Sequence, residues 1–279
     1  MISIIICSRR ASLPQSLVEN IESTIGCAYE WVLIDNSQNR YSIFEAYNLG
    51  IQKSKGDYLC FVHDDVLFHT IGWGDILFDV FQSDENIGLI GIAGAKVKTK
   101  MPSAWWDCDD LCIRMHLKQH FKNGEIRDWK IGNQIAPLEE VVAIDGVFMV
   151  ARKDERILFL ESLKGFHNYD LNLSFEYLQK GYKIMVTNLI YLEHFSVGKL
   201  DASWYDSTVT LHKKYRSLLP LSIIESFDLN PLEFKNGSRF LKGLREHKMY
   251  KHVLELWIRL FVLKPISKFH FQFLKNIVS

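Results

Sequence analysis

The tripeptide His63-Asp64-Asp65 contains the residue types in this chain best suited to metal-assisted chemistry. Hard cations such as Mg²⁺ and Mn²⁺ prefer oxygen ligands, which one or two carboxylates can supply. A cation held there neutralises the charge that develops when a diphosphate leaves. Adjacent side chains of an extended segment diverge, so we expect Asp65 to bind the metal and Asp64 the ribose or sugar of the ligand. An acidic turn that caps a helix is the alternative.

The elements around this tripeptide alternate between strand and helix patterns, which predicts an α/β fold with a doubly wound, mostly parallel sheet and flanking helices. Ligands of such sheets bind outside the carboxyl ends of the strands. The tripeptide and the turn Asp35-Asn36-Ser37 both follow strands, so we expect one shared site. The expected strands are Ile2–Ile6, Trp31–Ile34, Tyr58–Val62 and Ile87–Ala93, and the expected helices are Ser12–Ile25, Ile43–Ser54 and Ile76–Gln82.

Composition excludes several classes of protein. The 33 basic and 33 acidic residues cancel, whereas a nucleic-acid-binding protein is strongly basic. The five cysteines lack the spacing of a metal or disulfide framework, so we expect free thiols in a reducing compartment. The sequence shows neither a signal-peptide pattern nor an apolar stretch long enough to span a membrane. A cytoplasmic enzyme is the expectation.

The segment from Tyr47 to Asp65 resembles the core of family-2 glycosyltransferases of the GT-A fold. It has an Asn-x-Gly, a helix, Gly56-Asp57-Tyr58, an apolar strand and then an Asp-rich turn. The opening residues 4–9 and the Asp35 turn also match in order and spacing. His63 stands where many members carry the first Asp of an Asp-x-Asp motif, which leaves Asp65 as the surer metal ligand.

The second half of the chain resembles a bacterial subgroup of that family related to a streptomycin-biosynthesis protein. The resemblance covers residues 1 to 220, which we expect to form the GT-A domain, with 221–279 as a helical C-terminal appendage. The matching segments are Asp145–Met149, Gly165–Asn172, Gly181–Ile184 and His194–Gly198.

The resemblance implies an inverting, metal-dependent transferase. The donor would be a UDP-, GDP- or dTDP-sugar, and the acceptor a hydroxyl of a glycan or lipid-linked glycan in bacterial surface polysaccharide synthesis. Asp170 resembles the base that takes the acceptor proton, although a carboxylate there could also cap the following helix. Asn172 stands where an Asp is frequent, which weakens acceptor binding or indicates a different acceptor.

Further site residues follow from the same resemblance. Asp35 is similar to the residue that contacts the nucleotide base, and Ser8 and Arg9 line the same pocket. Asp145 would contact the donor sugar or the acceptor, and Gly146 would allow close approach of the backbone. His194 resembles a histidine that completes the metal shell, a ligand that suits Mn²⁺ better than Mg²⁺. A structural role is the alternative for His194, as it is for His167.

The irregular stretch from residue 96 to 137, where we expect mainly loops, contains two further features. Trp105 and Trp106 could stack on a sugar ring or pack in the core. Asp107, Asp109 and Asp110 form a rival acidic cluster, which we interpret as a solvated loop because no convincing strand precedes it.

The segment from Pro231 to Ser279 is basic and aromatic, with ten Lys or Arg residues and three Glu. This pattern is typical of helices that attach to an anionic membrane surface, which would make the enzyme peripheral at the inner face of the cell membrane. Helices packed on the main domain or at a dimer contact are the alternative.

Two other classes of protein remain open at the level of sequence. A nucleotidyltransferase also has a parallel sheet and an acidic metal site, but it generally needs a Gly-rich loop after the first strand, and residues 7–14 contain no glycine. A non-catalytic sugar- or membrane-binding module could keep the same fold. The presence of Asp65 and Asp170 argues against a non-catalytic module, whereas Asn172, in place of a frequent Asp, keeps that alternative open.

Overall fold

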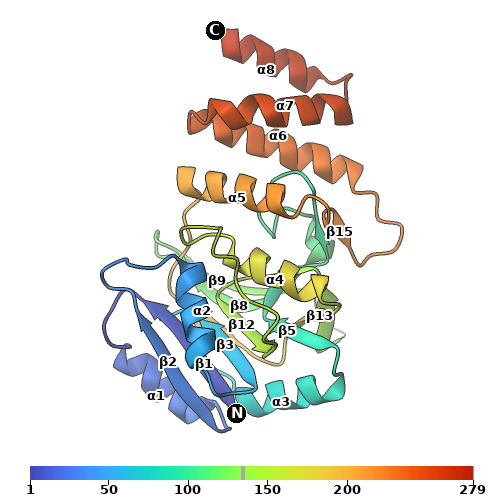
Figure 1. The fold of residues 1–279 in the computed structure, drawn as a ribbon. Coiled ribbons are helices and arrows are strands. Elements are labelled where there is room, and N and C mark those ends of the chain that lie inside the picture. Colours follow the sequence, from blue (N-terminus) through green and yellow to red (C-terminus); the bar gives the residue numbers. More distant parts are fainter. Residues whose placement is uncertain (133–135, 279) are drawn as a thin grey trace.

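The computed structural model describes residues 1–132 and 136–278 and has a seven-stranded sheet at its centre (Figure 1). The strand order is β10-β13-β5-β12-β3-β1-β2. β12 and the edge strand β10 run antiparallel to their neighbours, and the other neighbours pair in parallel. The predicted α/β class with a mostly parallel sheet is therefore confirmed. The strands are β1 (Ile2–Ser8), β2 (Tyr29–Asp35), β3 (Tyr58–Val62), β5 (Ile87–Gly91), β10 (Leu138–Val141), β12 (Phe148–Arg152) and β13 (Lys183–Thr187).

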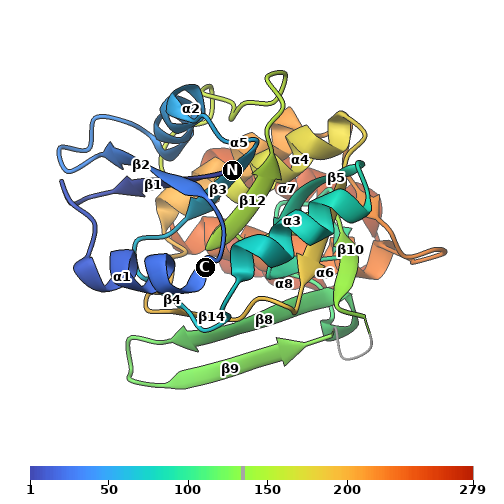
Figure 2. The same cartoon turned by 90° about the horizontal axis from the view of Figure 1, so that it is seen from below.

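Two pairs of helices cover the two faces of this sheet (Figure 2). Tyr47 of α2 and Tyr169 of α4 meet over one face, with ring centroids 5.6 Å apart. On the other face, the Trp73 indole N–H of α3 donates to the Thr24 hydroxyl of α1 over 3.1 Å. The sheet is thus doubly wound, as the alternating sequence pattern predicts. The helices are α1 (Gln15–Thr24), α2 (Ile43–Lys53), α3 (Trp73–Ser83) and α4 (Tyr169–Gln179).

A second sheet contains much of the region that we expected to be loops (Figure 2). The expectation was wrong for β8 (Ile113–His120), whose residues alternate between buried and half-buried, and for β9 (Ile126–Ile131), which pairs with it. Residues 133–135 of that stretch lie outside the described part of the chain. The sheet order is β11-β6-β8-β14-β4, and the other strands are β4 (Val66–Phe68), β6 (Ala93–Ala95), β11 (Ala143–Ile144) and β14 (Leu192–His194).

The second sheet brings the two halves of the chain together. His194 of β14 lies opposite Val66 of β4, the residue directly after His63-Asp64-Asp65. The segment 141–144 is divided between the two sheets: β10 ends at Val141 and β11 starts at Ala143. The chain then passes through residues 145–147 beside the His63-Asp64-Asp65 turn, where the His63 N–H donates to the Val147 carbonyl oxygen over 3.2 Å.

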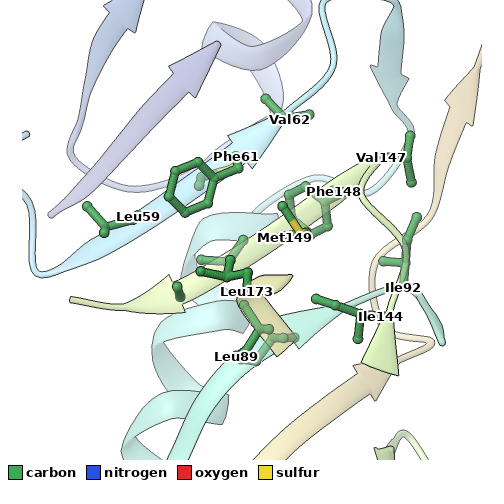
Figure 3. Close-up of a cluster of buried hydrophobic side chains, with 14 of the residues drawn as sticks. Leu59, Phe61, Val62, Leu89, Ile92, Ile144, Val147, Phe148, Met149 and Leu173 are labelled. Carbon is green, nitrogen blue, oxygen red and sulfur yellow. The ribbon is translucent and has the colours of Figure 1, made fainter. Parts of the chain in front are cut away.

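The hydrophobic core includes a cluster of buried side chains from β3, β5, β12 and α4 (Figure 3). Phe61, Phe148, Met149 and Leu173 are each at most 1% exposed there. Burying a side chain of this size contributes roughly 1.5–3 kcal/mol. The core therefore fixes the end of β3, from which the His63-Asp64-Asp65 turn continues, and the start of β12.

The last four helices stack in layers beyond the sheet (Figure 1). Their inner faces share an apolar cluster with Met101 and Ala104, which lie in the loop after residue 98. The Glu233 carboxylate of α6 accepts the backbone N–H groups of Lys100 and Met101, at 2.6 and 2.7 Å. The C-terminal segment is therefore packed against the main domain. These elements are α5 (Ala202–Lys214), α6 (Asn230–Glu246), α7 (Tyr250–Leu263) and α8 (Lys268–Val278), with β15 (Leu221–Ser222) paired to β7 (Val97–Lys98).

Candidate active site

Three side chains converge on one point at the carboxyl end of β3. His63 Nδ1 lies 3.2 Å from His194 Nε2, and Asp65 Oδ1 lies 3.8 Å and 3.5 Å from these two nitrogens. Burial would raise the pKa of Asp65, but the neighbouring His194 outweighs it and lowers the pKa, so the carboxylate is ionised at neutral pH. Two imidazoles and a carboxylate at these distances form a site that could hold a metal ion.

The hydrogen bonds of His63 orient its ring for this role. His63 Nε2 lies 2.7 Å from the Tyr169 hydroxyl, which in turn donates to the Gly146 carbonyl oxygen over 3.3 Å. The contact with Gly146 allows the tautomer in which His63 Nε2–H donates to Tyr169, which has only one proton to give. A metal ion on Nδ1 requires this tautomer, because it leaves the lone pair of His63 on the side that faces His194.

His194 is oriented from the opposite side. The Gln119 amide nitrogen donates to the backbone carbonyls of His194 and Ser196, so the Gln119 Oε1 atom is the acceptor for His194 Nδ1–H at 3.0 Å. The lone pair of His194 lies on Nε2, on the side that faces His63. Burial, and then the adjacent His194, lower the pKa of His63, which favours the neutral ring over the imidazolium. A neutral imidazole is the form that binds a metal cation.

The residues expected to hold the nucleotide lie at the neighbouring strand ends. The Ser8 hydroxyl, at the end of β1, donates to Asp64 Oδ2 over 2.5 Å. Ser8 is the register partner of Asp35, whose exposed carboxylate accepts the Ser37 backbone N–H over 2.9 Å. The exposed Arg9 guanidinium lies 6.0 Å from the centre of the Phe166 ring. Asp64 and Asp65 point to different partners, as the divergence of adjacent side chains predicts.

A second pair of acidic residues, Asp145 and Asp170, interacts electrostatically, and Asp145 also acts on His63. Burial, and then the charge of Asp145, raise the pKa of Asp170 to about 7. Asp145 is held in place because it accepts the Val147 backbone N–H over 2.8 Å and the Trp105 indole N–H over 2.9 Å. Trp105 is 4% exposed and therefore supports Asp145 from the core, and it does not offer a face for stacking.

Gly146 allows Tyr169 to reach this turn. A Cβ atom at position 146 would lie 2.4 Å from the Tyr169 hydroxyl oxygen, closer than any real contact. The expected close approach at Gly146 is thus to an aromatic side chain of the protein itself, the one that orients His63.

Two residues considered for the site have structural contacts. His167 Nε2 lies 3.1 Å from the Ser203 hydroxyl at the start of α5 and is not among the residues that converge on the metal site. Asn172 is fully buried, and its side chain donates to the Tyr215 hydroxyl over 2.5 Å and accepts the Leu160 N–H over 3.0 Å. The Asn at position 172 therefore ties α4 to its neighbours.

The rival acidic cluster contacts the C-terminal helices. Asp107 accepts the Ala104 backbone N–H over 2.8 Å and pairs with Arg239 of α6 over 2.7 Å. Asp109 pairs with Lys235 of the same helix at 3.3 Å. Our interpretation of this cluster as a solvated loop holds for the exposed Asp110 and is wrong for Asp107, whose side chain is 9% exposed.

Three residues of the site were not assigned a role from the sequence: His63, Tyr169 and Gln119. Gln119 lies on β8, the strand that we did not expect. Its apolar neighbours Met115 and Leu117 at alternate positions are the signal that could have placed it inward. His63 departs from the Asp of the family pattern, but an imidazole can take the same ligand position.

Comparison with known proteins agrees with this geometry. The sequence model of a family described as "Glycosyltransferase like family" matches residues 3–214. The chain belongs to this family. It is a family-2-like glycosyltransferase. The matched region lies within residues 1–220, the part of the chain that carries the resemblance, and helices α6–α8 lie outside the match.

Two relatives extend the comparison. The glycosyltransferase is 24% identical over 202 residues to a protein of Fuscovulum blasticum named "ATP synthase subunits region ORF 6", covering 70% of this chain and 74% of that protein. It also resembles the crystal structure of GalNAc-T7 with UDP, GalNAc and Mn²⁺, with a TM-score of 0.51 and 13% identity, over 88% of this chain. The chain spans 54% of that structure's length. The GT-A fold is thereby confirmed.

Proposed function

We propose that this glycosyltransferase is an inverting, metal-dependent enzyme that moves a sugar from a nucleotide-diphosphate sugar to a hydroxyl of a glycan or glycolipid. One observation carries the proposal: His63 Nδ1 and His194 Nε2 lie 3.2 Å apart beside the ionised Asp65. A bound divalent cation would offset the charge of the departing diphosphate. Mn²⁺ suits a ligand set with two imidazoles better than Mg²⁺ does.

The nucleotide would lie across the ends of β1 and β2. Asp35 would contact the base, and Asp64, whose carboxylate accepts the Ser8 hydroxyl, would accept hydroxyl groups of the ribose or sugar. Arg9 is exposed beside them and could pair with a phosphate. Each of these roles stays a prediction.

Asp170 would accept the proton of the acceptor hydroxyl as the sugar transfers. A general base works best when its pKa lies near the operating pH, and burial together with Asp145 raises that of Asp170 to about 7. One carboxylate that deprotonates an incoming hydroxyl is what direct, inverting displacement requires.

The biological setting is part of the proposal. The resemblance to bacterial enzymes favours surface polysaccharide synthesis, and a lipid-linked acceptor would place the enzyme at the inner face of the cell membrane. Among the described helices, none is both long and apolar enough to cross a bilayer. We expect the basic, aromatic segment 221–279 to provide the attachment surface.

A thermal-shift screen tests the donor assignment. The full chain is melted with each of a panel of UDP-, GDP- and dTDP-sugars, with and without Mn²⁺. Binding to the native state at 100 times the dissociation constant stabilises it by about 2.7 kcal/mol. We expect one nucleotide class to raise the melting temperature by several degrees, and only with the metal. Equal shifts with and without Mn²⁺ would contradict metal-dependent binding, and the nucleoside monophosphates serve as matched controls.

A further inference from the structure

The outer surface of the C-terminal helices carries an unusual set of exposed apolar side chains. They occupy one side of α7, the turn between α7 and α8, and one side of α8, at the end of the molecule farthest from the central sheet (Figure 1). We call these residues the α7–α8 apolar surface. They are Tyr250, Leu254, Ile258, Phe261, Val262, Ile266, Phe271 and Leu274.

The packing of α7 shows that this surface is distinct from its core contacts. Val253, Leu256 and Leu260 are buried in the apolar cluster shared with α5 and α6. Leu254 and Ile258 are 61% and 50% exposed and lie one helical turn apart on the opposite side. The inner face of α7 thus already anchors the helix. The outer apolar side chains are exposed to water and contribute little to the stability of the fold.

The exposure is greatest where α7 ends and α8 begins. Val262 is 74% exposed, Ile266 in the turn is 92% exposed, and Phe271 in the first half of α8 is 77% exposed. Lys264 and Lys268, both exposed, flank this turn. Large apolar side chains alternating with lysines at an exposed turn could insert into a lipid interface while the ammonium groups stay among the headgroups.

The charge of this region is predominantly positive. Residues 248–275 contain six Lys or Arg and a single acidic residue, Glu255, in a chain whose net charge is zero. Glu255 is paired with Lys213 of α5 at 2.7 Å, so its charge is already compensated. An exposed basic surface in a neutral protein favours an anionic partner.

We propose that the α7–α8 apolar surface docks on an anionic lipid bilayer. A bilayer offers both an apolar layer for the exposed side chains and negative headgroups for the lysines around them. A second copy of the chain is a poorer occupant, because a two-fold contact through this surface would place like charges opposite each other. The proposal does not depend on the donor or the acceptor of the transfer reaction.

Vesicle co-sedimentation of the full chain tests this. Wild-type protein should bind vesicles rich in phosphatidylglycerol, bind weakly to phosphatidylcholine vesicles, and lose affinity as salt rises. The triple variant Leu254→Ser, Ile258→Ser, Val262→Ser removes three exposed apolar groups, and we expect at least roughly tenfold weaker binding from the lost apolar burial. The melting temperature should stay unchanged, because none of the three packs in the core.

The matched control is Leu111→Ser, Ile126→Ser, Leu158→Ser. These residues are also exposed and apolar but lie outside α7 and α8, so this variant should bind vesicles like the wild type. Equal loss in both triple variants, or vesicle binding that the first variant leaves unchanged, would overturn the proposal. Absence of vesicle binding together with a wild-type dimer that the first variant dissociates would assign the surface to a second copy instead.

Discussion

The Asp65→Ala variant should lose Mn²⁺-dependent donor binding while remaining folded. The carboxylate is the only anionic member of the His63, Asp65 and His194 set, so its loss leaves two neutral imidazoles to hold a dication. Metal stabilisation of a leaving diphosphate is worth several kcal/mol, and each 1.36 kcal/mol is tenfold in rate, so we expect transfer to fall by roughly 10²–10⁴-fold. Titration calorimetry with Mn²⁺ and a nucleoside diphosphate measures the binding loss directly.

The matched control for Asp65→Ala is Asp110→Ala. Asp110 is an exposed member of the rival acidic cluster, so its removal takes away the same charge without touching the site. This variant should bind Mn²⁺ and donor like the wild type. Retained Mn²⁺ affinity in Asp65→Ala, or its loss in Asp110→Ala, would show that the metal is held elsewhere.

The Asp170→Asn variant should keep donor binding and lose transfer. An amide of the same shape cannot accept the proton of the acceptor hydroxyl, and general-base catalysis typically contributes about 10²–10⁴-fold. Steady-state kinetics should therefore show a large fall in kcat, with the donor dissociation constant unchanged. Asp79→Asn, an exposed change of the same type on α3, is the control. Wild-type rates in Asp170→Asn would mean that another group acts as the base.

The pH dependence of Asp170 gives the same variant a second readout. The pKa in the folded protein is raised from 3.8 to about 7, so the native state binds this proton more tightly than the unfolded chain does. The stability that protonation provides is full below the unfolded pKa and is lost as pH rises toward 7. Asp170→Asn should therefore melt higher than the wild type at pH 8, with the difference vanishing near pH 4. Transfer by the wild type should rise with pH, with an acid limb at or below 7, since a bound cation would lower the pKa of Asp170 from its raised value.

The central fold could be predicted because its signals are local. Buried parallel strands such as β1 are continuous apolar runs, and the polar turns at their ends mark the ligand edge of the sheet. That reasoning placed Asp35, Asp64 and Asp65 at one edge, and the register of β1 with β2 and β3 brings those strand ends together.

The completion of the metal site could not be predicted from such signals. His194 reaches Asp65 through pairing of β14 with β4, two strands of three residues each, separated by more than 120 positions. Gln119 orients His194 from β8, whose alternation of apolar and polar residues indicates a strand but does not tell which strands it pairs with. Contacts between distant short strands depend on the packing of both sheets, which one sequence does not display.

The position of the metal tests the account most directly. A crystal of the full chain with Mn²⁺ and a nucleoside diphosphate gives an anomalous difference map. The map locates the metal by its own scattering, independently of any assumption about its ligands. The account predicts one strong peak at coordination distance from His63 Nδ1, His194 Nε2 and a carboxylate oxygen of Asp65, with the diphosphate beside it. A bound nucleotide with no peak at these atoms, or with the metal at Asp107 and Asp109, would contradict it.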